Sequence, residues 1–577
     1  MIKELAACVG EYKRDSLLAP FFVVMEVVME VLIPLLMADL IDKGITVGNM
    51  AYVWKMGAVL VVLALFSLAF GALSGAYAAR GSAGFAKNLR KNMYDHIQTY
   101  SFANIDKYST GGLITRLTTD ANNVQMAYMM IIRIAIRCPV MLILALVCAV
   151  KIHLRLSMLF LIALPILGIG LYFIMIKSFP LFTLMFKAYD HLNNVVQENL
   201  SAVRVVKAFV REKHETEKFK GASGNLYDLS TRAEKILVMN GPLMIFVIYL
   251  CTVGLSWFGA KFIVAGSLTT GGLVSMLTYI MQILMSLMML SMVFVMIVMA
   301  RASAERITEV LQERPSLASP EHPLETVADG SIAFENVSFS YAGEGHPLCL
   351  KNVDLSIPSG ATVGILGETG SAKSTLVQLI PRLYDVTEGR VLVGGHDVRE
   401  YDMNVLRDNV AMVLQKNVLF SGTIKDNLRW GNPNATEEEM REACVLAEAD
   451  GFIQSFPDGY DTHIEQGGAN VSGGQKQRLC IARALLKKPK ILIFDDSTSA
   501  VDMATDARIR DSLSRCLPDT TKLIIAQRIA SVENADQIIV LEDGEILAVG
   551  NHETLMKTCE VYRETALSQK KGGENDA

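Results

Sequence analysis

The sequence lacks the cysteine patterns that mark a disulfide framework or a zinc site. Its nine cysteines are scattered, and no two are separated by only two residues, so we expect them to act as small buried hydrophobic side chains. A large charge of one sign is also absent, because the formal net charge is −5, which gives no reason to expect a nucleic-acid partner. The apolar run after the basic N-terminus is too long for a signal-peptide core, and no cleavage site is evident, so we expect this end to stay on the mature protein.

Apolar residues, by contrast, are abundant. They make up 51% of the chain, and its mean hydropathy is +0.34, which is high for a soluble protein and low for one that lies wholly in a membrane. At 577 residues the chain is also too long for a single hydrophobic core. These values predict at least two domains, one in lipid and one in water.

Six stretches are apolar enough to cross a bilayer, which takes about 20 residues of helix. Two of the connections between them, residues 80–127 and 178–238, are long, polar and poor in turn signals, so we expect long helices there. These connections carry more Lys and Arg than the short ones, which places them and both termini in the cytoplasm. The predicted spans are residues 17–40, 57–79, 128–150, 156–176, 239–265 and 272–300.

The composition changes after the sixth span. Prolines between residues 315 and 323 end a charged helix, and β-like runs at residues 332–339 and 350–357 open a region in which strands and helices alternate. We predict an α-helical membrane domain over residues 1–310, a linker over 311–330, an α/β domain over 331–566 and a polar tail over 567–577.

A glycine-rich loop follows the apolar run at residues 362–366 and leads directly into a predicted helix. A strand, a loop that ends in Lys373-Ser374 and a helix form the context that a phosphate-binding P-loop requires. Backbone N–H groups would surround the β-phosphate of ATP at the positive end of the helix, Lys373 would add charge, and the Ser374 hydroxyl would hold Mg²⁺. The predicted nucleotide-binding residues here are Gly367, Thr369, Gly370, Ser371, Ala372, Lys373, Ser374 and Thr375.

Ala372 departs from the usual P-loop motif, which has glycine at this position. Because a residue at the start of a helix need not have a positive φ, we expect the methyl group to be tolerated and nucleotide binding to be retained. The sequence leaves open whether Ala372 weakens ATP binding.

Two further signals lie downstream: residues 471–478 (VSGGQKQR) and an apolar strand at 491–494 that ends in Asp495-Asp496. With them the chain resembles the ATP-binding cassette (ABC) transporters, and specifically half-transporters of the exporter type. The resemblance covers nearly the whole chain, since six spans, long cytoplasmic extensions, a linker and a P-loop nucleotide-binding domain follow in the expected order. It implies ATP and Mg²⁺ as cofactors and a multi-pass protein of the bacterial inner (cytoplasmic) membrane.

The resemblance also implies roles for single residues. Tyr341 resembles the aromatic residue that stacks on adenine, with an ordinary strand-edge tyrosine as the alternative. Gln415 resembles the glutamine that touches Mg²⁺ and senses the membrane domain, and Asp495 is similar to the carboxylate that holds the Mg²⁺ shell. In the family, two nucleotide domains dimerise head to tail, and a signature sequence of one completes the site of the other. The signature corresponds to Ser472, Gly473, Gly474 and Gln475, and residues 499–502 resemble the loop that crosses to the partner.

Two positions that act on the γ-phosphate in the family carry other residues here. The glutamate that polarises the attacking water is replaced by Asp496, whose carboxylate lies on the order of 1 Å closer to the backbone, and a shift of that size can cost about 10²-fold in rate. The histidine after the next strand is replaced by Gln527, which can donate a hydrogen bond but never carries positive charge. We therefore predict that this site binds ATP and hydrolyses it slowly or not at all.

An intact signature beside an impaired site indicates a heterodimer that resembles bacterial heterodimeric ABC exporters. A second, non-identical half-transporter would supply a working P-loop site, which the signature of this chain would complete. The expected function is export of hydrophobic compounds, drugs or lipids, by alternating access. Residues 106–117 and 198–209 resemble segments near the two cytoplasmic coupling helices, with ordinary amphipathic helices as the alternative. A homodimer, an importer of a small chelate, and a regulatory or channel-like protein with low turnover are the alternative functions.

The spans hold two features that could meet cargo. Glu26 and Glu30 lie four residues apart on the first span, and Arg133 and Arg137 lie four apart on the third, so we expect pairing as 26/133 and 30/137 or contact with cationic cargo; snorkelling of the arginines at the bilayer edge is the alternative. A methionine stripe on the sixth span would suit varied hydrophobic cargo, with helix packing or lipid contact as the alternative. The stripe contains Met281, Met285, Met288, Met292, Met296 and Met299.

Overall fold

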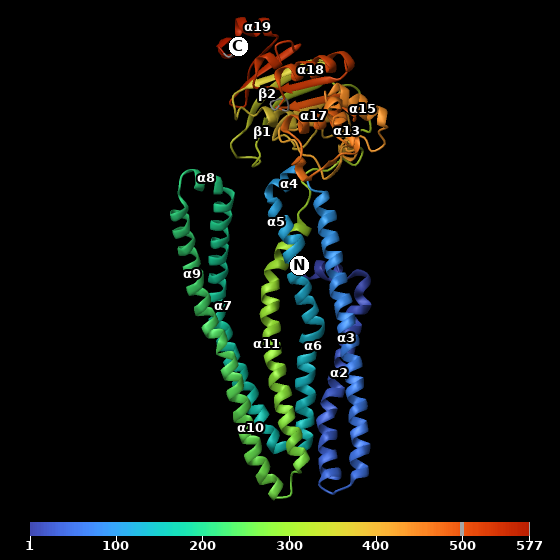
Figure 1. The fold of residues 1–577 in the computed structure, drawn as a ribbon, viewed down its shortest axis with the longest axis vertical. Coiled ribbons are helices and arrows are strands. Elements are labelled where there is room, and N and C mark those ends of the chain that lie inside the picture. Colours follow the sequence, from blue (N-terminus) through green and yellow to red (C-terminus); the bar gives the residue numbers. More distant parts are fainter. Residues whose placement is uncertain (497–500, 576–577) are drawn as a thin grey trace. The chain divides into compact units, whose positions relative to one another are not determined.

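The fold is taken from a computed structural model, which describes residues 1–496 and 501–575, with side chains up to residue 569. The chain divides into two compact units, which Figure 1 shows coloured along the sequence. The first unit contains Met1–Gln98 and Thr110–Glu313, and the second contains Thr99–Ser109 and Arg314–Ala577. The short segment Thr99–Ser109 is therefore packed with the C-terminal part of the chain, although both of its neighbours in sequence belong to the first unit.

Six helical stretches of the first unit, within the described residues, are long and apolar enough to cross a membrane. This confirms the six apolar helices predicted for the membrane domain. Two of the helices, α3 and α7, run on from the apolar stretch into the polar connection for a total of 49 and 48 residues. The main helices (Figure 1) are α2 (Lys13–Asp39), α3 (Met50–Gln98), α6 (Ala121–Ile152), α7 (Leu154–Ser201), α9 (Glu212–Val238), α10 (Asn240–Val264) and α11 (Thr270–Gln312).

The core of the first unit lies where α2, α6, α7, α10 and α11 meet. Val27, Phe160 and Tyr279 are fully buried there, and the Tyr279 hydroxyl donates a hydrogen bond to the carbonyl oxygen of Val31 at 2.7 Å. Each helix satisfies its own backbone hydrogen bonds, so its outer face can be apolar and exposed, as a lipid environment requires. Three short helices belong to the connections: α4 (Phe102–Lys107), α5 (Thr110–Thr115) and α8 (Val203–Ala208).

The second unit contains two large sheets. A mainly parallel sheet has the strand order β12-β11-β3-β10-β9-β6, in which only the edge strand β12 runs antiparallel to its neighbour. An antiparallel sheet has the order β2-β1-β4-β5. The strands of the parallel sheet are β3 (Thr362–Gly367), β6 (Val410–Val413), β9 (Ile491–Asp495), β10 (Thr521–Ile525), β11 (Gln537–Glu542) and β12 (Glu545–Gly550). The other sheet consists of β1 (Ile332–Phe339), β2 (Leu350–Ile357), β4 (Glu388–Val393) and β5 (His396–Asp397). This is the predicted α/β domain, which confirms the fold class.

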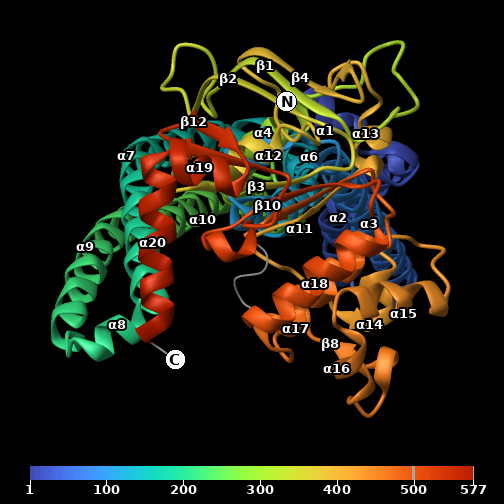
Figure 2. The ribbon, with the colours of Figure 1, turned by 90° about the horizontal axis from the view of Figure 1, so that it is seen from above.

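Helices form a separate layer of the second unit. Helix α17 packs against α14 and α15, and Figure 2 shows this helical group on the side of the unit away from strands β1, β2 and β4. These helices are α14 (Ile424–Leu428), α15 (Glu437–Leu446) and α17 (Gly473–Leu485). Near the C-terminus, helix α20 (Glu560–Asn575) continues through most of the stretch in which the sequence analysis places a polar tail.

Candidate nucleotide-binding site

Four neighbouring parallel strands bring the predicted site residues to one edge of the sheet. Strands β3, β10, β9 and β6 lie side by side in that order, and the carboxyl ends of parallel strands meet at a single edge. The P-loop follows β3, Gln527 follows β10, Asp495 ends β9 with Asp496 directly after it, and Gln415 follows β6. A cavity of about 610 Å³ opens at this edge, and its lining includes Thr369, Gly370, Ala372, Lys373, Ser374, Thr375, Gln415, Asp495, Asp496 and Gln527.

The P-loop has the backbone geometry of a phosphate cradle. A side chain at Gly367 would collide with the carbonyl oxygen of Leu541, and Gly370 has a φ of 93°, which favours glycine. The Lys373 ammonium donates hydrogen bonds to the carbonyl oxygens of Gly367 at 2.8 Å and Glu368 at 2.6 Å. Burial lowers the pKa of Lys373, and the nearby carboxylates of the site oppose that fall. The loop therefore holds a cationic group between two of its own backbone carbonyl acceptors.

Ala372 adopts a conformation that the sequence analysis did not expect. Its φ is 69° and its ψ 22°, in the left-handed region, and helix α12 (Lys373–Gln378) begins directly after it. The expectation that this position could avoid a positive φ is wrong, because the turn into α12 requires it. A residue with a Cβ costs about 1–2 kcal/mol in this region, so the backbone of the P-loop is strained at Ala372.

Ser374 and Asp495 together offer oxygen ligands suited to Mg²⁺. The Ser374 hydroxyl donates a hydrogen bond to Oδ1 of Asp495 at 2.7 Å, and Asp495 is 4% exposed. Burial raises the pKa of Asp495, and the bond from Ser374 opposes the rise. Mg²⁺ is usually held by one or two protein oxygens together with substrate phosphates and water. The donor set therefore fits the ion that accompanies ATP.

The two residues that depart from the family pattern touch each other. Gln527 Nε2 donates a hydrogen bond to Oδ2 of Asp496 at 2.8 Å, and Gln415 Nε2 approaches the same oxygen at 3.4 Å. Asp496 also has a positive φ of 46°. Its carboxylate is thus held by amide donors at the mouth of the cavity.

Tyr341 lies beside the P-loop helix and outside the lining of the cavity. Its hydroxyl is 3.0 Å from the Thr375 hydroxyl on α12, and its side chain is partly exposed. Its ring meets Phe339 and Tyr384 edge to face, with centroid distances of 4.9 Å and 5.1 Å. Burial raises the pKa of Tyr341, so the phenol is neutral at physiological pH.

The signature residues lie away from this cavity. Ser472 caps helix α17, in a capping box with Gln475, and Ser472 and Gly473 are exposed. None of the residues Ser472, Gly473, Gly474 and Gln475 lines the cavity. Of the predicted crossing loop, Ser499 and Ala500 lie outside the described residues, and Asp502 caps helix α18 (Met503–Cys516) by accepting a hydrogen bond from the Thr505 amide.

The charged residues of the spans pair as predicted in one of the two expected pairs. Arg137 binds both acids, with Nη1 at 2.5 Å from Glu26 and Nη2 at 2.6 Å from Glu30. The expected 30/137 pair is confirmed. The expected 26/133 pair is wrong, because the guanidinium of Arg137 binds two carboxylates that are one helical turn apart. In the stripe on α11, Met281, Met285, Met288, Met292 and Met299 are exposed within this chain.

Sequence reasoning missed several residues near the site. Cys349, Lys351 and Asp543 line the cavity, and Asp543 precedes Gly544 in the turn that joins β11 to β12. An Asp-Gly pair between two strands does signal a tight hairpin, but nothing in the sequence places that hairpin next to the P-loop. Tyr384, which contacts Tyr341, belongs to none of the motifs that the sequence analysis used.

Comparisons with known proteins identify the family to which the chain belongs. Residues 16–287 match the ABC transporter transmembrane region, and residues 350–499 match the ABC transporter family. The chain is 39% identical over 544 residues to an uncharacterized ABC transporter ATP-binding protein of Mycobacterium tuberculosis, covering 93% of each chain. It is 31% identical to the ATP-dependent lipid A-core flippase of Desulfotalea psychrophila, covering 96% of this chain and 97% of the flippase.

A solved structure has the same fold along its whole length. It is that of a bacterial Atm1-family ABC exporter with ATP bound, with a TM-score of 0.84 and 25% sequence identity, covering 96% of this chain and 99% of the exporter chain. The order of the elements and the matched families together assign the chain to one protein family. The chain belongs to the ABC transporters, as a multi-pass half-transporter of the exporter type with one ATP-binding domain.

Proposed function

We propose that this chain is the ATP-binding, weakly hydrolysing subunit of a heterodimeric ABC exporter in the bacterial cytoplasmic membrane. The observation that carries the proposal is the hydrogen bond from Gln527 Nε2 to Oδ2 of Asp496 at 2.8 Å. A general base must reach the proton of the attacking water. Here the base is an aspartate, and one of its oxygens already accepts a hydrogen bond from a side chain that cannot become charged.

The remainder of the site supports nucleotide binding. Lys373, Ser374 and Asp495 line the same cavity, and the bond between Ser374 and Asp495 supports a role for them in holding the phosphates and Mg²⁺. Binding and cleavage draw on different groups: the loop holds the nucleotide, whereas cleavage needs a placed base and a charge on the transferring phosphoryl group. The combination supports a site that is loaded with ATP and turns over slowly.

The signature supports a role at a second site. Ser472 and Gly473 are exposed at the start of helix α17, and the positive end of a helix attracts phosphate. Because these residues do not line the cavity of their own chain, the site that they complete belongs to a partner subunit. A partner with a full glutamate and histidine would then carry out most of the hydrolysis.

The cargo is proposed to be hydrophobic, a drug or a lipid. Five of the methionines of the α11 stripe are exposed in this chain, and flexible thioether side chains adapt to varied apolar shapes. Similarity to lipid A-core flippases at 31% identity also favours an amphiphilic cargo. ATP binding would close the nucleotide domains and open the cavity outward, and hydrolysis at the partner's site would reset it.

The test is co-purification with a second half-transporter followed by ATPase measurements. Replacing the catalytic glutamate of the partner by glutamine should abolish nearly all ATP hydrolysis, whereas Asp496→Asn should cause little further loss. Rapid ATP hydrolysis by this chain purified alone would refute the proposal, because a homodimer contains two copies of the impaired site.

A further inference from the structure

Tyr384 connects the nucleotide site to the segment Thr99–Ser109. Its hydroxyl donates a hydrogen bond to Oδ2 of Asp106 at 2.5 Å. Its ring meets the ring of Tyr341 edge to face, at 5.1 Å and 90°, and that of Phe102 at 6.1 Å and 64°. All of these residues belong to the second unit, so one side chain contacts both the predicted base-stacking tyrosine and helix α4.

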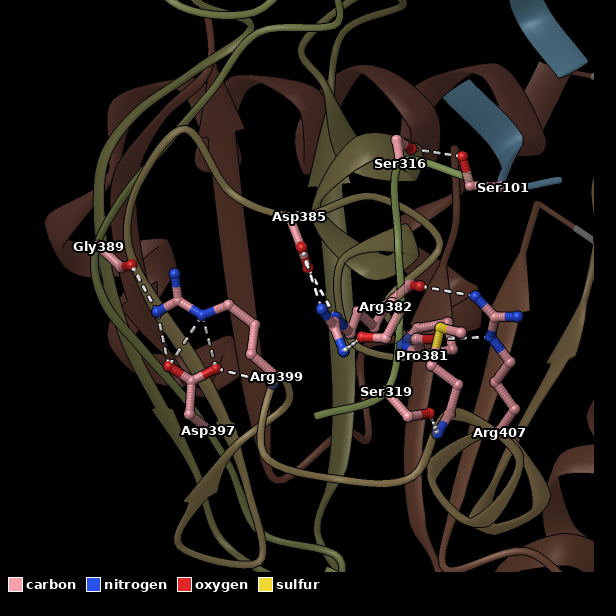
Figure 3. Close-up of polar contacts among 12 residues, drawn as sticks. Ser101, Ser316, Ser319, Pro381, Arg382, Asp385, Gly389, Asp397, Arg399 and Arg407 are labelled. Carbon is pink, nitrogen blue, oxygen red and sulfur yellow. Dashed lines mark hydrogen bonds and ion pairs between the residues drawn. The ribbon is translucent and has the colours of Figure 1, made fainter. Parts of the chain in front are cut away.

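Hydrogen bonds hold residues 381–385, the turn to which Tyr384 belongs, and Figure 3 shows Pro381, Arg382, Asp385 and Arg407, which make these bonds. Arg382 has a φ of 51°, and its guanidinium binds the Asp385 carboxylate with contacts of 2.7 Å and 3.1 Å. The Arg407 guanidinium donates to the backbone carbonyl oxygens of Pro381 at 3.3 Å and Arg382 at 2.9 Å. Hydrogen bonds on both sides of Tyr384 therefore hold its backbone in place.

The other end of the contact is fixed as well. The Ser101 and Ser316 hydroxyls lie 2.5 Å apart (Figure 3). Asn104 Nδ2 donates to the carbonyl oxygen of Arg314 at 3.0 Å, and its Oδ1 accepts from the Ser316 amide at 3.0 Å. These bonds fix helix α4 to the start of the linker. Asp106, which lies on α4, therefore contacts Tyr384 from a segment whose position is fixed by hydrogen bonds.

The remaining link runs from Tyr341 to the P-loop helix. The Tyr341 hydroxyl lies 3.0 Å from the Thr375 hydroxyl, and the rings of Tyr341, Tyr384 and Phe339 form a cluster in which each contacts the other two. Burial, followed by the bond to Asp106, raises the pKa of Tyr384, so its phenol stays protonated and remains the donor. Without Asp106 the hydroxyl of Tyr384 loses this acceptor, and the tilt of its ring against Tyr341 is then held by ring packing alone.

We propose that Tyr384 and Asp106 are positioning residues for ATP binding, which act by setting the ring of Tyr341 for contact with the adenine base. The inference rests on the role proposed for Tyr341. It makes the affinity for ATP depend on the segment between α3 and α5. By linkage, ATP binding also stabilises the Tyr384–Asp106 contact by the same factor.

The experiment measures equilibrium binding of Mg-ATP and of Mg-tripolyphosphate, which has phosphates but no base, to the full-length chain in lipid nanodiscs. The variants are Tyr384→Phe, Asp106→Ala, the double variant and Tyr341→Ala. Tyr401→Phe is the matched control, because Tyr401 is a buried tyrosine of the same unit whose hydroxyl donates to the carbonyl oxygen of Val393 at 2.8 Å. Thermal unfolding of each variant checks that it is folded.

We expect Tyr384→Phe and Asp106→Ala each to weaken ATP binding about fivefold, with tripolyphosphate affinity unchanged. The double variant should bind ATP no more weakly than the single variant with the larger loss of affinity, because both substitutions remove the same interaction. Tyr401→Phe should change neither affinity.

Three results would overturn the inference. Unchanged ATP affinity in Tyr384→Phe and Asp106→Ala, with a loss in Tyr341→Ala, would refute the link and leave Tyr341 in its role. Equal weakening of ATP and tripolyphosphate would mean that the pair only supports the fold. Unchanged ATP affinity in Tyr341→Ala would refute both the link and the proposed base contact.

Discussion

Converting the two departing residues to those of the family should create a hydrolytic site on this chain. In Asp496→Glu the added methylene moves the carboxylate outward by about 1 Å, and correcting a misplacement of that order is worth about 10²-fold in rate. In Gln527→His the 2.8 Å amide contact to Oδ2 of Asp496 is removed and a group that can be positively charged replaces it. A single preorganised donor to a developing charge is worth about 10²-fold or more.

The double variant should therefore hydrolyse ATP up to about 10⁴-fold faster than the wild-type site, which is the product of the two factors, and each single variant should gain much less than about 10²-fold. With Asp496→Glu alone the lengthened carboxylate still faces an uncharged glutamine, and with Gln527→His alone the base still lies too close to the backbone. Residues that act as a unit are not additive in their effects on rate. The assay is phosphate release at saturating Mg-ATP in the complex with the partner subunit, whose own catalytic glutamate is replaced by glutamine so that only this site is measured.

Asp496→Asn is the matched control, since it keeps the size of the side chain and removes the charge. It should leave ATP hydrolysis at this site at its low wild-type level and ATP affinity nearly unchanged. If the double variant binds ATP normally but gains no activity, the two departures are not what limits the site. That result would refute the reasoning.

Three further changes test other parts of the structure. Ala372→Gly should raise the free energy of unfolding by about 1 kcal/mol by relieving the left-handed backbone, whereas Ala482→Gly within helix α17 should lower it by about 1 kcal/mol or more; thermal unfolding distinguishes the two. Arg137→Met should destabilise the protein in nanodiscs by about 3–5 kcal/mol, because two acids lose their partner, and Arg133→Met should destabilise it less. Lys373→Ala should abolish measurable ATP binding, by loss of the P-loop charge; retained binding would contradict the site.

Elements with strong local patterns were predictable from the sequence. The spans follow from runs of apolar residues, and the P-loop follows from a strand, a glycine-rich loop and Lys373-Ser374, because each pattern is complete within one short stretch. The sequence also places the P-loop, Asp495 and Gln527 at the ends of strands, but the order that sets these strands side by side comes from the structure.

What the sequence could not reveal depends on distances between elements. Ala372 is an ordinary residue by type, and only the turn into α12 forces its positive φ. Both arginines of the third span lie on one helical face, and the offset between α2 and α6 decides that Arg137 meets both acids. The packing of Thr99–Ser109 with the second unit depends on bonds to Arg314 and Ser316, more than 200 residues away in sequence.

The fork of Arg137 onto Glu26 and Glu30 has a consequence for how the membrane unit can move. The two bonds lie one turn apart along α2, so sliding or rotating α2 against α6 would break both at once and leave three charges without partners in a poorly polarisable medium. Helices α2 and α6 should consequently move together as one rigid body during the transport cycle. The hinges that open the pathway must then lie at other helix contacts.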